Sequence, residues 1–270
     1  MEKPSIKIIS GWSDPGGSTV AFINLCNLFN DNGIDCTYFG PHKWHLDKCK
    51  SSTMDKITLA EDDNVLSHFI RPSSDLKKAC RRHVLSCHET NMYPIAKMIK
   101  SGRLKKNEYS FFQYVSESQR EWHRVFTPYH VIPNVISELN PSKCSDDAVG
   151  IIGSIDPHKR THLSIKRALE DDCGKIYLFG KITDVDYFNL RILPLMGDNV
   201  EYLGHLDNKQ EMYDKVKTVY HSSKRETFNL VKAECQKAEV EYRGLNSADS
   251  NAEYLSNEDI LNKWKEALEL

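Results

Sequence analysis

Several features are scarce in this chain of 270 residues, and each absence excludes a class of protein. No apolar run approaches the roughly 20 residues that a membrane-spanning helix needs. Residues 1–5 lack the apolar core of a signal peptide. The net charge is −2, so no basic field draws the whole chain to nucleic acid or anionic lipid. These absences predict a cytoplasmic protein without a membrane span, and they argue against a nucleic-acid partner without excluding one.

Closely spaced cysteine pairs are also missing. The chain has 8 cysteines, and none of them forms a Cys-x-x-Cys motif. An extracellular disulfide framework and a structural zinc site both depend on such patterns. We therefore expect reduced, mostly buried thiols and no metal site. The remaining composition, 40% hydrophobic and 27% charged, is that of an ordinary globular protein.

The first half of the chain alternates between strand-like and helix-like segments. Residues 6–10 predict a strand, and a glycine-rich loop follows it. A helix over 20–32 and a strand over 36–39 complete a β-loop-α-β unit, the usual start of a Rossmann-like sheet. Weaker segments follow at 65–69 (helix or strand), 83–87 (strand), 110–115 (strand), 116–124 (helix) and 129–132 (strand).

A second alternating series begins after a polar, proline-containing stretch at 140–147, which is typical of a linker. Its strands are expected at 148–153, 175–180, 200–204 and 216–220, and its helices at 161–169, 184–195 and 208–215. The pattern predicts an α/β protein with two Rossmann-like lobes facing a cleft. We expect the lobes at 1–139 and 146–255, with a C-terminal helix at 256–270 that packs back on the first lobe.

Two glutamates, Glu226 and Glu234, follow the last of these strands and a polar turn, residues 221–223. A helical segment between them would separate the carboxylates by about 12 Å along the axis. That distance is too large for a glycosidase-type acid and base, so we exclude such a pair. It suits one group at each end of an extended ligand. The alternative is that both are solvated helix residues.

The order of several segments resembles retaining glycosyltransferases of the GT-B type, in family 4, as a shortened member. The segments are Gly16-Gly17-Ser18, His88-Glu89-Thr90, residues 131–136, residues 150–160, residues 200–204 and the pair Glu226-x7-Glu234. The match spans nearly the whole chain, and its specificity lies in the order and spacing of the segments.

The resemblance implies a role for each matched residue. Lys159 corresponds to the lysine that binds the donor diphosphate, Glu226 to the carboxylate that holds a sugar hydroxyl, and Glu234 to the one that takes both ribose hydroxyls. His88 corresponds to a contact with the donor sugar or the acceptor. We expect Glu226, Lys159 and His88 to be catalytic. The donor-binding candidates are Glu234, Gly16, Gly17, Ser154, Thr227, Phe228, Asn229 and Leu230.

Two departures from the family pattern concern the donor site. Ser154 stands where the family usually has an arginine, and Arg160 or Lys181 is a candidate to supply that charge. Thr227 and Asn229 replace smaller residues, which would narrow the sugar pocket or add a hydrogen bond.

Each candidate also has a plain structural alternative. Lys159 could be a surface lysine, His88 a structural histidine, the glycine pair an ordinary turn and Asn134 a turn former. A cluster of His42, Trp44 and His45 fits loop packing or acceptor contact.

The resemblance implies transfer of a sugar, with retention of configuration, from a UDP- or GDP-linked donor to a hydroxyl of a glycan, a lipid-linked or another acceptor. No cofactor or metal is required, because Lys159 and a helix terminus would stand in for a cation. One alternative is a non-catalytic module that binds a nucleotide sugar or a partner. Another is a viral-type enzyme that glycosylates modified DNA bases, using Arg81-Arg82-His83 and Lys105-Lys106.

Overall fold

The computed structural model describes residues 5–11, 16–41, 46–68, 80–88, 101, 108–123, 128–245 and 252–270. The chain divides into two compact units. The first comprises Met1–Ile136 and Asn251–Leu270, and the second comprises Ser137–Ser250. The C-terminal segment thus belongs to the first unit, and residues 140–147 belong to the second.

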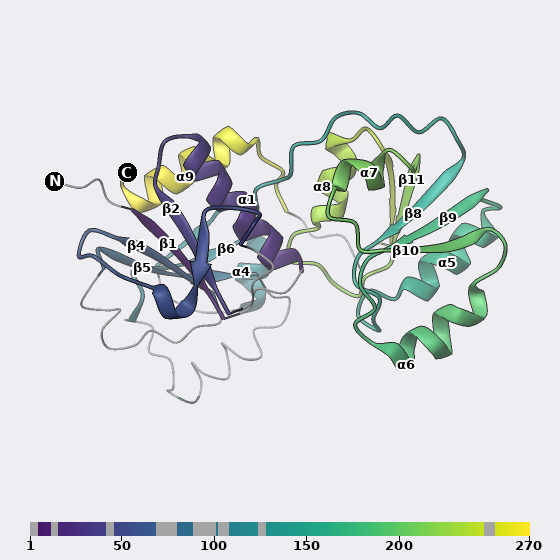
Figure 1. Cartoon of the computed structure of the whole chain (residues 1–270), viewed down its shortest axis with the longest axis horizontal. Coiled ribbons are helices and arrows are strands. Elements are labelled where there is room, and N and C mark those ends of the chain that lie inside the picture. The colour runs from purple at the N-terminus through teal and green to yellow at the C-terminus, as the bar shows by residue number, and fades with distance from the viewer. Residues whose placement is uncertain are drawn as a thin grey trace. The chain divides into compact units, whose positions relative to one another are not determined.

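The first unit is built on a parallel sheet of 7 strands in the order β3-β2-β1-β4-β5-β6-β7 (Figure 1). Its strands are β1 (Ile6–Ser10), β2 (Cys36–Gly40), β3 (Ser51–Thr53), β4 (Asn64–His68), β5 (Arg82–Cys87), β6 (Phe111–Tyr114) and β7 (Tyr129–Val131). Its helices are α1 (Gly17–Asp31), a 3₁₀ turn (Met54–Lys56), α4 (Glu117–His123) and α9 (Asn257–Leu268). The segment that could have been helix or strand, 65–69, is strand β4.

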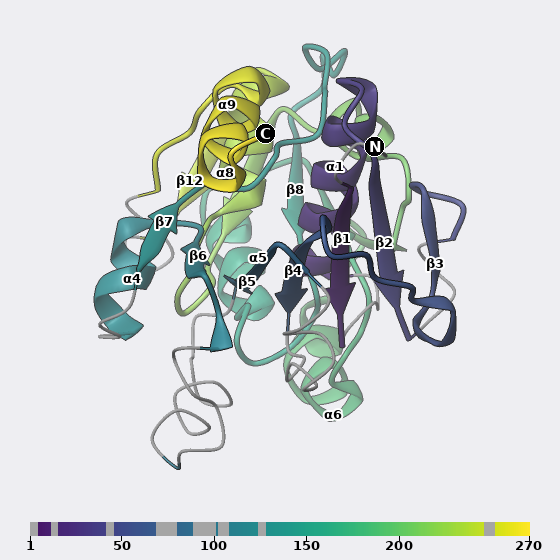
Figure 2. The same cartoon turned by 90° about the vertical axis from the view of Figure 1, so that its left-hand side faces the viewer.

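Helices α1 and α9 share one core against this sheet (Figure 2). The rings of Phe29 on α1 and Trp264 on α9 lie 6.2 Å apart, and Trp264 is almost fully buried. Ser256 caps α9 because its Oγ accepts the N–H of Asp259 at 3.0 Å. The heptad-like spacing of Ile260, Leu261 and Trp264 explains why one face of α9 is buried.

The second unit is built on a parallel sheet of 5 strands in the order β10-β9-β8-β11-β12. Its strands are β8 (Ala148–Ile152), β9 (Lys175–Phe179), β10 (Val200–Gly204), β11 (Thr218–His221) and β12 (Glu241–Gly244). Its helices are α5 (Thr161–Glu170), α6 (Val185–Tyr187) with a π-helical turn (Phe188–Ile192) and a 3₁₀ turn (Leu193–Leu195), α7 (Lys209–Tyr213) and α8 (Leu230–Lys237). Helices α7 and α8 cover one face of this sheet, and α5 and α6 cover the other (Figure 1).

The structure bears out one helical expectation and departs from two others. The segment 184–195 is helical from Val185 to Leu195, as a succession of short α, π and 3₁₀ turns. Strands β3 and β12 were not predicted, because they are only three and four residues long and contain at most one apolar residue. Most important, the stretch from Glu226 to Glu234 is not helical throughout, since α8 begins only at Leu230. The axial separation of about 12 Å therefore does not apply.

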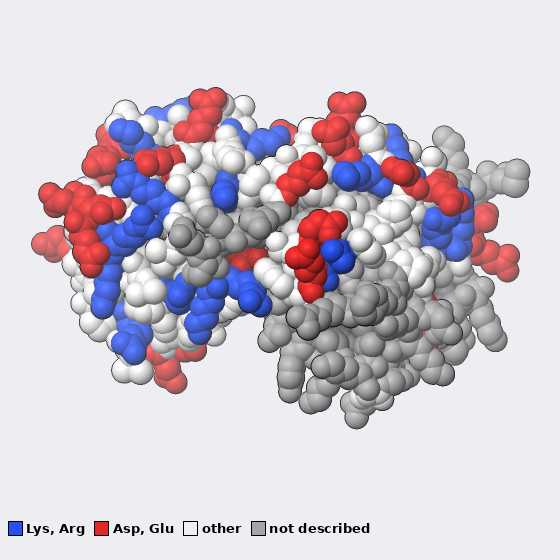
Figure 3. Space-filling model, turned by 180° about the vertical axis from the view of Figure 1, so that it is seen from behind, with Lys and Arg blue, Asp and Glu red and all other residues white. Residues whose placement is uncertain are grey.

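The surface carries charges of both signs, as the small net charge predicts. On the face shown in Figure 3, lysine and arginine side chains are interspersed with aspartate and glutamate. Along the described part of the chain, no helix is both long and apolar enough to cross a membrane.

Candidate functional site

The second sheet has a topological switch point between β8 and β11. The chain runs from β8 to β9 and β10 on one side, then returns to β11 on the other side of β8. Because the loops on the two sides leave in opposite directions, ligands of open parallel sheets bind outside the carboxyl ends of the strands at such a point. Residues 153–160 follow β8 here, and residues 222–229 follow β11.

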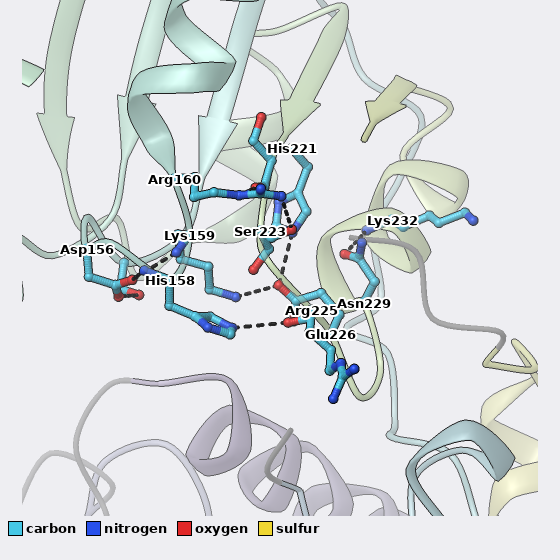
Figure 4. A network of polar contacts seen from close by, with 12 residues as sticks. Asp156, His158, Lys159, Arg160, His221, Ser223, Arg225, Glu226, Asn229 and Lys232 are labelled. Atoms are coloured by element: carbon cyan, nitrogen blue, oxygen red, sulfur yellow. Dashed lines mark hydrogen bonds and ion pairs between the residues drawn. The ribbon is translucent and has the colours of Figure 1, made fainter. Parts of the chain in front are cut away.

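Asp156 holds the loop after β8 in one conformation. Its Oδ1 accepts the backbone N–H groups of His158 at 2.8 Å and Lys159 at 2.9 Å, and its Oδ2 accepts the hydroxyl of Ser154 at 2.6 Å. Ser154, a donor-binding candidate, therefore makes a bond inside the loop. The backbone turn around Asp156 fixes where the Lys159 side chain starts (Figure 4).

Lys159 reaches across to Glu226, and the two form the centre of the site (Figure 4). The ammonium of Lys159 lies 2.7 Å from Oε1 of Glu226, and Nε2 of His221 lies 3.0 Å from the same oxygen. The Glu226 side chain is 11% exposed and that of Lys159 27%. Burial alone would favour the protonated acid, but Lys159 and His221 outweigh it and hold the pKa of Glu226 well below its usual range. The site thus contains an ionised carboxylate beside an ammonium.

Arg160 adds a second cation and fastens the two loops together. Its Nε donates to the carbonyl of Ser222 at 2.6 Å, and its Nη2 donates to that of Ser223 at 3.0 Å. A further link joins Nε2 of His158 to the carbonyl of Arg225 at 3.1 Å. Of the two residues considered for the missing arginine charge, Arg160 therefore belongs to this network, whereas Lys181 is exposed and follows β9.

Residues 227–229 are buried and lead into α8. Thr227 and Phe228 are buried, and Leu230 is the first residue of the helix. Asn229 caps it, since its Oδ1 accepts the N–H of Lys232 at 3.1 Å while its Nδ2 donates to the hydroxyl of Tyr242 at 2.6 Å. The amide of Asn229 is thus engaged in positioning α8.

Glu234 lies in α8 and is nearly inaccessible to solvent. Its side chain is 3% exposed, Oε1 forms an ion pair with Lys209, and Oε2 accepts the hydroxyl of Tyr213 at 3.0 Å. Both partners belong to α7. The sequence interpretation missed Lys209 and also His221. For Lys209 the available signal was its position directly after Asn208, a helix-capping residue type.

The remaining candidates belong to the first unit. Gly16 precedes α1 in an extended conformation, and Gly17 is the first helical residue. His88 follows β5 and packs against the ring of Phe22 at 4.4 Å and that of His68 at 5.6 Å. Burial, with a smaller effect of His68, holds the pKa of His88 well below its usual range. His88 is therefore a neutral imidazole at neutral pH.

Other predicted features can be placed only in part. Glu89 and Thr90, and the cluster of His42, Trp44 and His45, lie outside the described residues. Asn134 is buried after β7. None of the eight cysteines forms a disulfide bond. Within the described ranges, no group of three or more His, Cys, Asp or Glu side chains could hold a metal ion.

Solved glycosyltransferases match this structure over most of their length. The pneumococcal O-GlcNAc transferase GtfA, solved with UDP and GlcNAc, matches with a TM-score of 0.76 at 10% identity, over 100% of this chain and 99% of that chain. Alr3699/HepE from Anabaena, solved with UDP and glucose, matches with a TM-score of 0.70 at 13% identity, over 91% and 81%. TarM matches with a TM-score of 0.69 at 12% identity, over 99% and 91%. No protein-family model and no curated protein matches by sequence. These likenesses establish a shared fold and confirm the predicted α/β class.

Proposed function

We propose that this chain is a glycosyltransferase that moves a sugar from a nucleoside diphosphate donor to an acceptor hydroxyl, with retention of configuration. The observation that carries the proposal is the Lys159–Glu226 ion pair at the carboxyl ends of β8 and β11, on a fold shared with glycosyltransferases. Two such structures were solved with UDP together with a sugar, which supports a UDP-linked donor over a GDP-linked one.

Lys159 is the proposed ligand of the donor diphosphate. In sugar transfer the diphosphate leaves with a growing negative charge, and a cation fixed beside it lowers the barrier. Arg160 belongs to the same loop, and α5 and α8 both begin at this edge of the sheet, so their N-terminal dipoles add positive potential. This arrangement supplies positive charge at the leaving group from the protein's own residues.

Glu226 is the proposed acceptor for a hydroxyl of the donor sugar. Lys159 and His221 both contact Oε1, and no hydrogen bond from elsewhere in the described chain reaches Oε2. An ionised carboxylate oxygen is a strong acceptor for such a hydroxyl. Because the pKa of Glu226 is held well below its usual range, its carboxylate is a weak base and is unsuited to take the proton of the acceptor hydroxyl. The proposed reaction therefore leaves the proton of the acceptor hydroxyl to the departing phosphate.

A binding module without turnover is the second candidate function. It is favoured by Ser154, which stands in place of an arginine and is bonded to Asp156, and by Glu234, whose carboxylate already has two partners. Nucleotide binding without nucleotide release would identify such a module.

The structure gives less support to a DNA-modifying enzyme. Arg82 and Arg81 form ion pairs with Glu269 of the same unit, and His83 is buried. The basic and acidic side chains of the face in Figure 3 are mixed. Lys105 and Lys106 lie outside the described residues. Salt-dependent binding to duplex DNA would revive this candidate.

The experiment that tests the proposal combines binding and turnover. The purified chain is incubated with UDP- and GDP-linked sugars, alone and with glycan or lipid-linked acceptors, while released nucleotide and thermal unfolding are measured. We expect one donor to raise the unfolding temperature and to release its nucleotide in the presence of an acceptor. The product should carry the anomeric configuration of the donor. Inversion, or no response to any donor, would refute the proposal.

A further inference from the structure

Each glutamate of the pair is matched by a lysine from a different element. Lys159, in the loop after β8, contacts Glu226, and Lys209, at the start of α7, contacts Glu234. In both pairs the lysine is the more exposed partner. The Lys209 side chain is 22% exposed and that of Glu234 only 3%. At the second pair the lysine is therefore the partner that is open to solvent.

Helix α7 brings Lys209 to the same edge of the sheet as the rest of the site. It begins after the loop that follows β10, just as α8 begins after the loop that follows β11. The strands are parallel, so both loops leave from carboxyl ends. Asn208 fixes the start of α7, since its Oδ1 accepts the N–H of Gln210 at 3.1 Å. Lys209 is thus held on a defined helix turn.

Building on the proposed function, we propose that Lys209 binds the ribose of the donor nucleotide together with Glu234. One N–H of the ammonium is used by Glu234, and the others remain as donors for a hydroxyl oxygen. A carboxylate oxygen with one hydrogen bond keeps a further acceptor position for a hydroxyl proton. Side by side, the two groups match the two neighbouring hydroxyls of a ribose.

The charge of the pair favours a neutral diol over a phosphate. Lys209 and Glu234 compensate each other, and the third member of the group, Tyr213, is a phenol whose pKa is raised by burial and by Glu234. A phosphate would have to compete with Glu234 for the ammonium, whereas hydroxyls bind both charges without breaking the pair. The pair thereby assigns Lys209 to recognition of the sugar of the nucleotide rather than its diphosphate.

The test compares nucleotides that differ by one hydroxyl. Affinities for UDP, 2′-deoxy-UDP and 3′-deoxy-UDP are measured by titration calorimetry for the wild type, Lys209→Met and Lys237→Met. Lys237 is the matched control, because it lies on α8 and pairs with the exposed Glu138. We expect the wild type and Lys237→Met to prefer UDP over at least one deoxynucleotide about tenfold, the equivalent of about 1.4 kcal/mol. In Lys209→Met the preference should fall below about twofold.

The outcomes separate this inference from the proposed function. A Lys209→Met protein that keeps the full preference for UDP would show that Lys209 only neutralises Glu234, and would overturn the inference. Equal binding of all three nucleotides by the wild type would do the same while leaving nucleotide binding intact. A wild type that binds no nucleotide refutes both. If Lys209→Met does not fold, Lys209→Gln replaces it with the same expected loss, and Lys209→Arg should keep the preference.

Discussion

Lys159 and Glu226, 67 positions apart in the sequence, form an ion pair of 2.7 Å where β8 and β11 end. The contact joins the two loops that flank the switch point of the second sheet. Arg160 and His158 add two further links between the same loops, through the carbonyls of Ser222 and Arg225. Because each loop is held by side chains of the other, a substitution in one loop should alter the conformation of both.

The first prediction concerns the pH dependence of stability. Glu226 has a folded pKa well below its unfolded value of about 4.3, so its pairing stabilises the fold fully above that pH. This contribution is lost as the pH falls below about 4.3 toward the folded pKa. Glu226→Gln should therefore be less stable than the wild type by about 2 kcal/mol at pH 7, and the difference should shrink between pH 5 and pH 3.

This measurement must report on the second unit. All 4 tryptophans, at positions 12, 44, 122 and 264, belong to the first unit, so their fluorescence is unsuitable. Hydrogen exchange of peptides from β8 and β11 gives the local free energy of opening at each pH. Glu241→Gln is the control, since Glu241 is a half-exposed partner of Arg243 outside the site. A difference that stays constant from pH 7 to pH 3 would contradict the assigned ion pair.

The second prediction concerns catalysis. Lys159→Met should lower kcat/KM for the donor about 100-fold, the usual cost of removing one group that stabilises developing negative charge. Lys175→Met is the matched control, because Lys175 lies at the opposite, amino end of β9, where its ammonium contacts the carbonyl of Asp198. Donor turnover by the two variants is compared by nucleotide release. Similar rates for both would show that Lys159 does not contact the diphosphate.

The order of elements could be predicted from the sequence, but the partners of the site residues could not. Short apolar runs indicated both sheets, because a strand of a parallel sheet is buried on both faces. Strand β3, the sequence Ser51-Ser52-Thr53, carries no such signal and forms only by pairing with β2. Strands β8 and β11 become neighbours because the chain returns from β10 to the other side of β8. No local sequence pattern marks such a return.

The same limit applies to the residues of the site. Glu226 and Lys159 are candidates from their sequence context, whereas His221 and Lys209 are not, because their contacts with Glu226 and Glu234 depend on how the chain folds. The start of α8 could have been placed better. Asn229 is a typical capping residue, and recognising it would have put Glu226 in the preceding loop.

The third prediction concerns a close approach of two glycines. Gly180 follows β9 with a φ of +140°, and a Cβ there would lie 1.9 Å from the carbonyl oxygen of Gly153. Gly180→Ala should destabilise the second unit by about 3 kcal/mol or more, through steric overlap and backbone strain. Because Gly153 begins the loop that carries Lys159, donor affinity should fall as well. Hydrogen exchange and UDP titration measure the two effects.

The control for this substitution is Gly33→Ala. Gly33 also has a positive φ, +74°, but no atom lies within 4 Å of a Cβ built there. Gly33→Ala should therefore lower the free energy of unfolding only by the backbone strain, about 1 kcal/mol, and leave UDP affinity unchanged. Equal costs for the two variants would show that the loops after β8 and β9 are not in contact.

The fourth prediction concerns the C-terminal helix. Trp264 on α9 is 2% exposed and packs against Phe29 of α1, so Trp264→Ala should destabilise the first unit by about 3–5 kcal/mol. Trp122→Ala, at a position that is 36% exposed on α4, should cost about 0.5 kcal/mol or less. Urea unfolding followed by the remaining tryptophans reports on this unit. Hydrogen exchange in β8 and β11 should be unchanged, because α9 belongs to the core of the first unit. Equal losses in both units would mean that α9 stabilises the chain as a whole, contrary to the division of its cores.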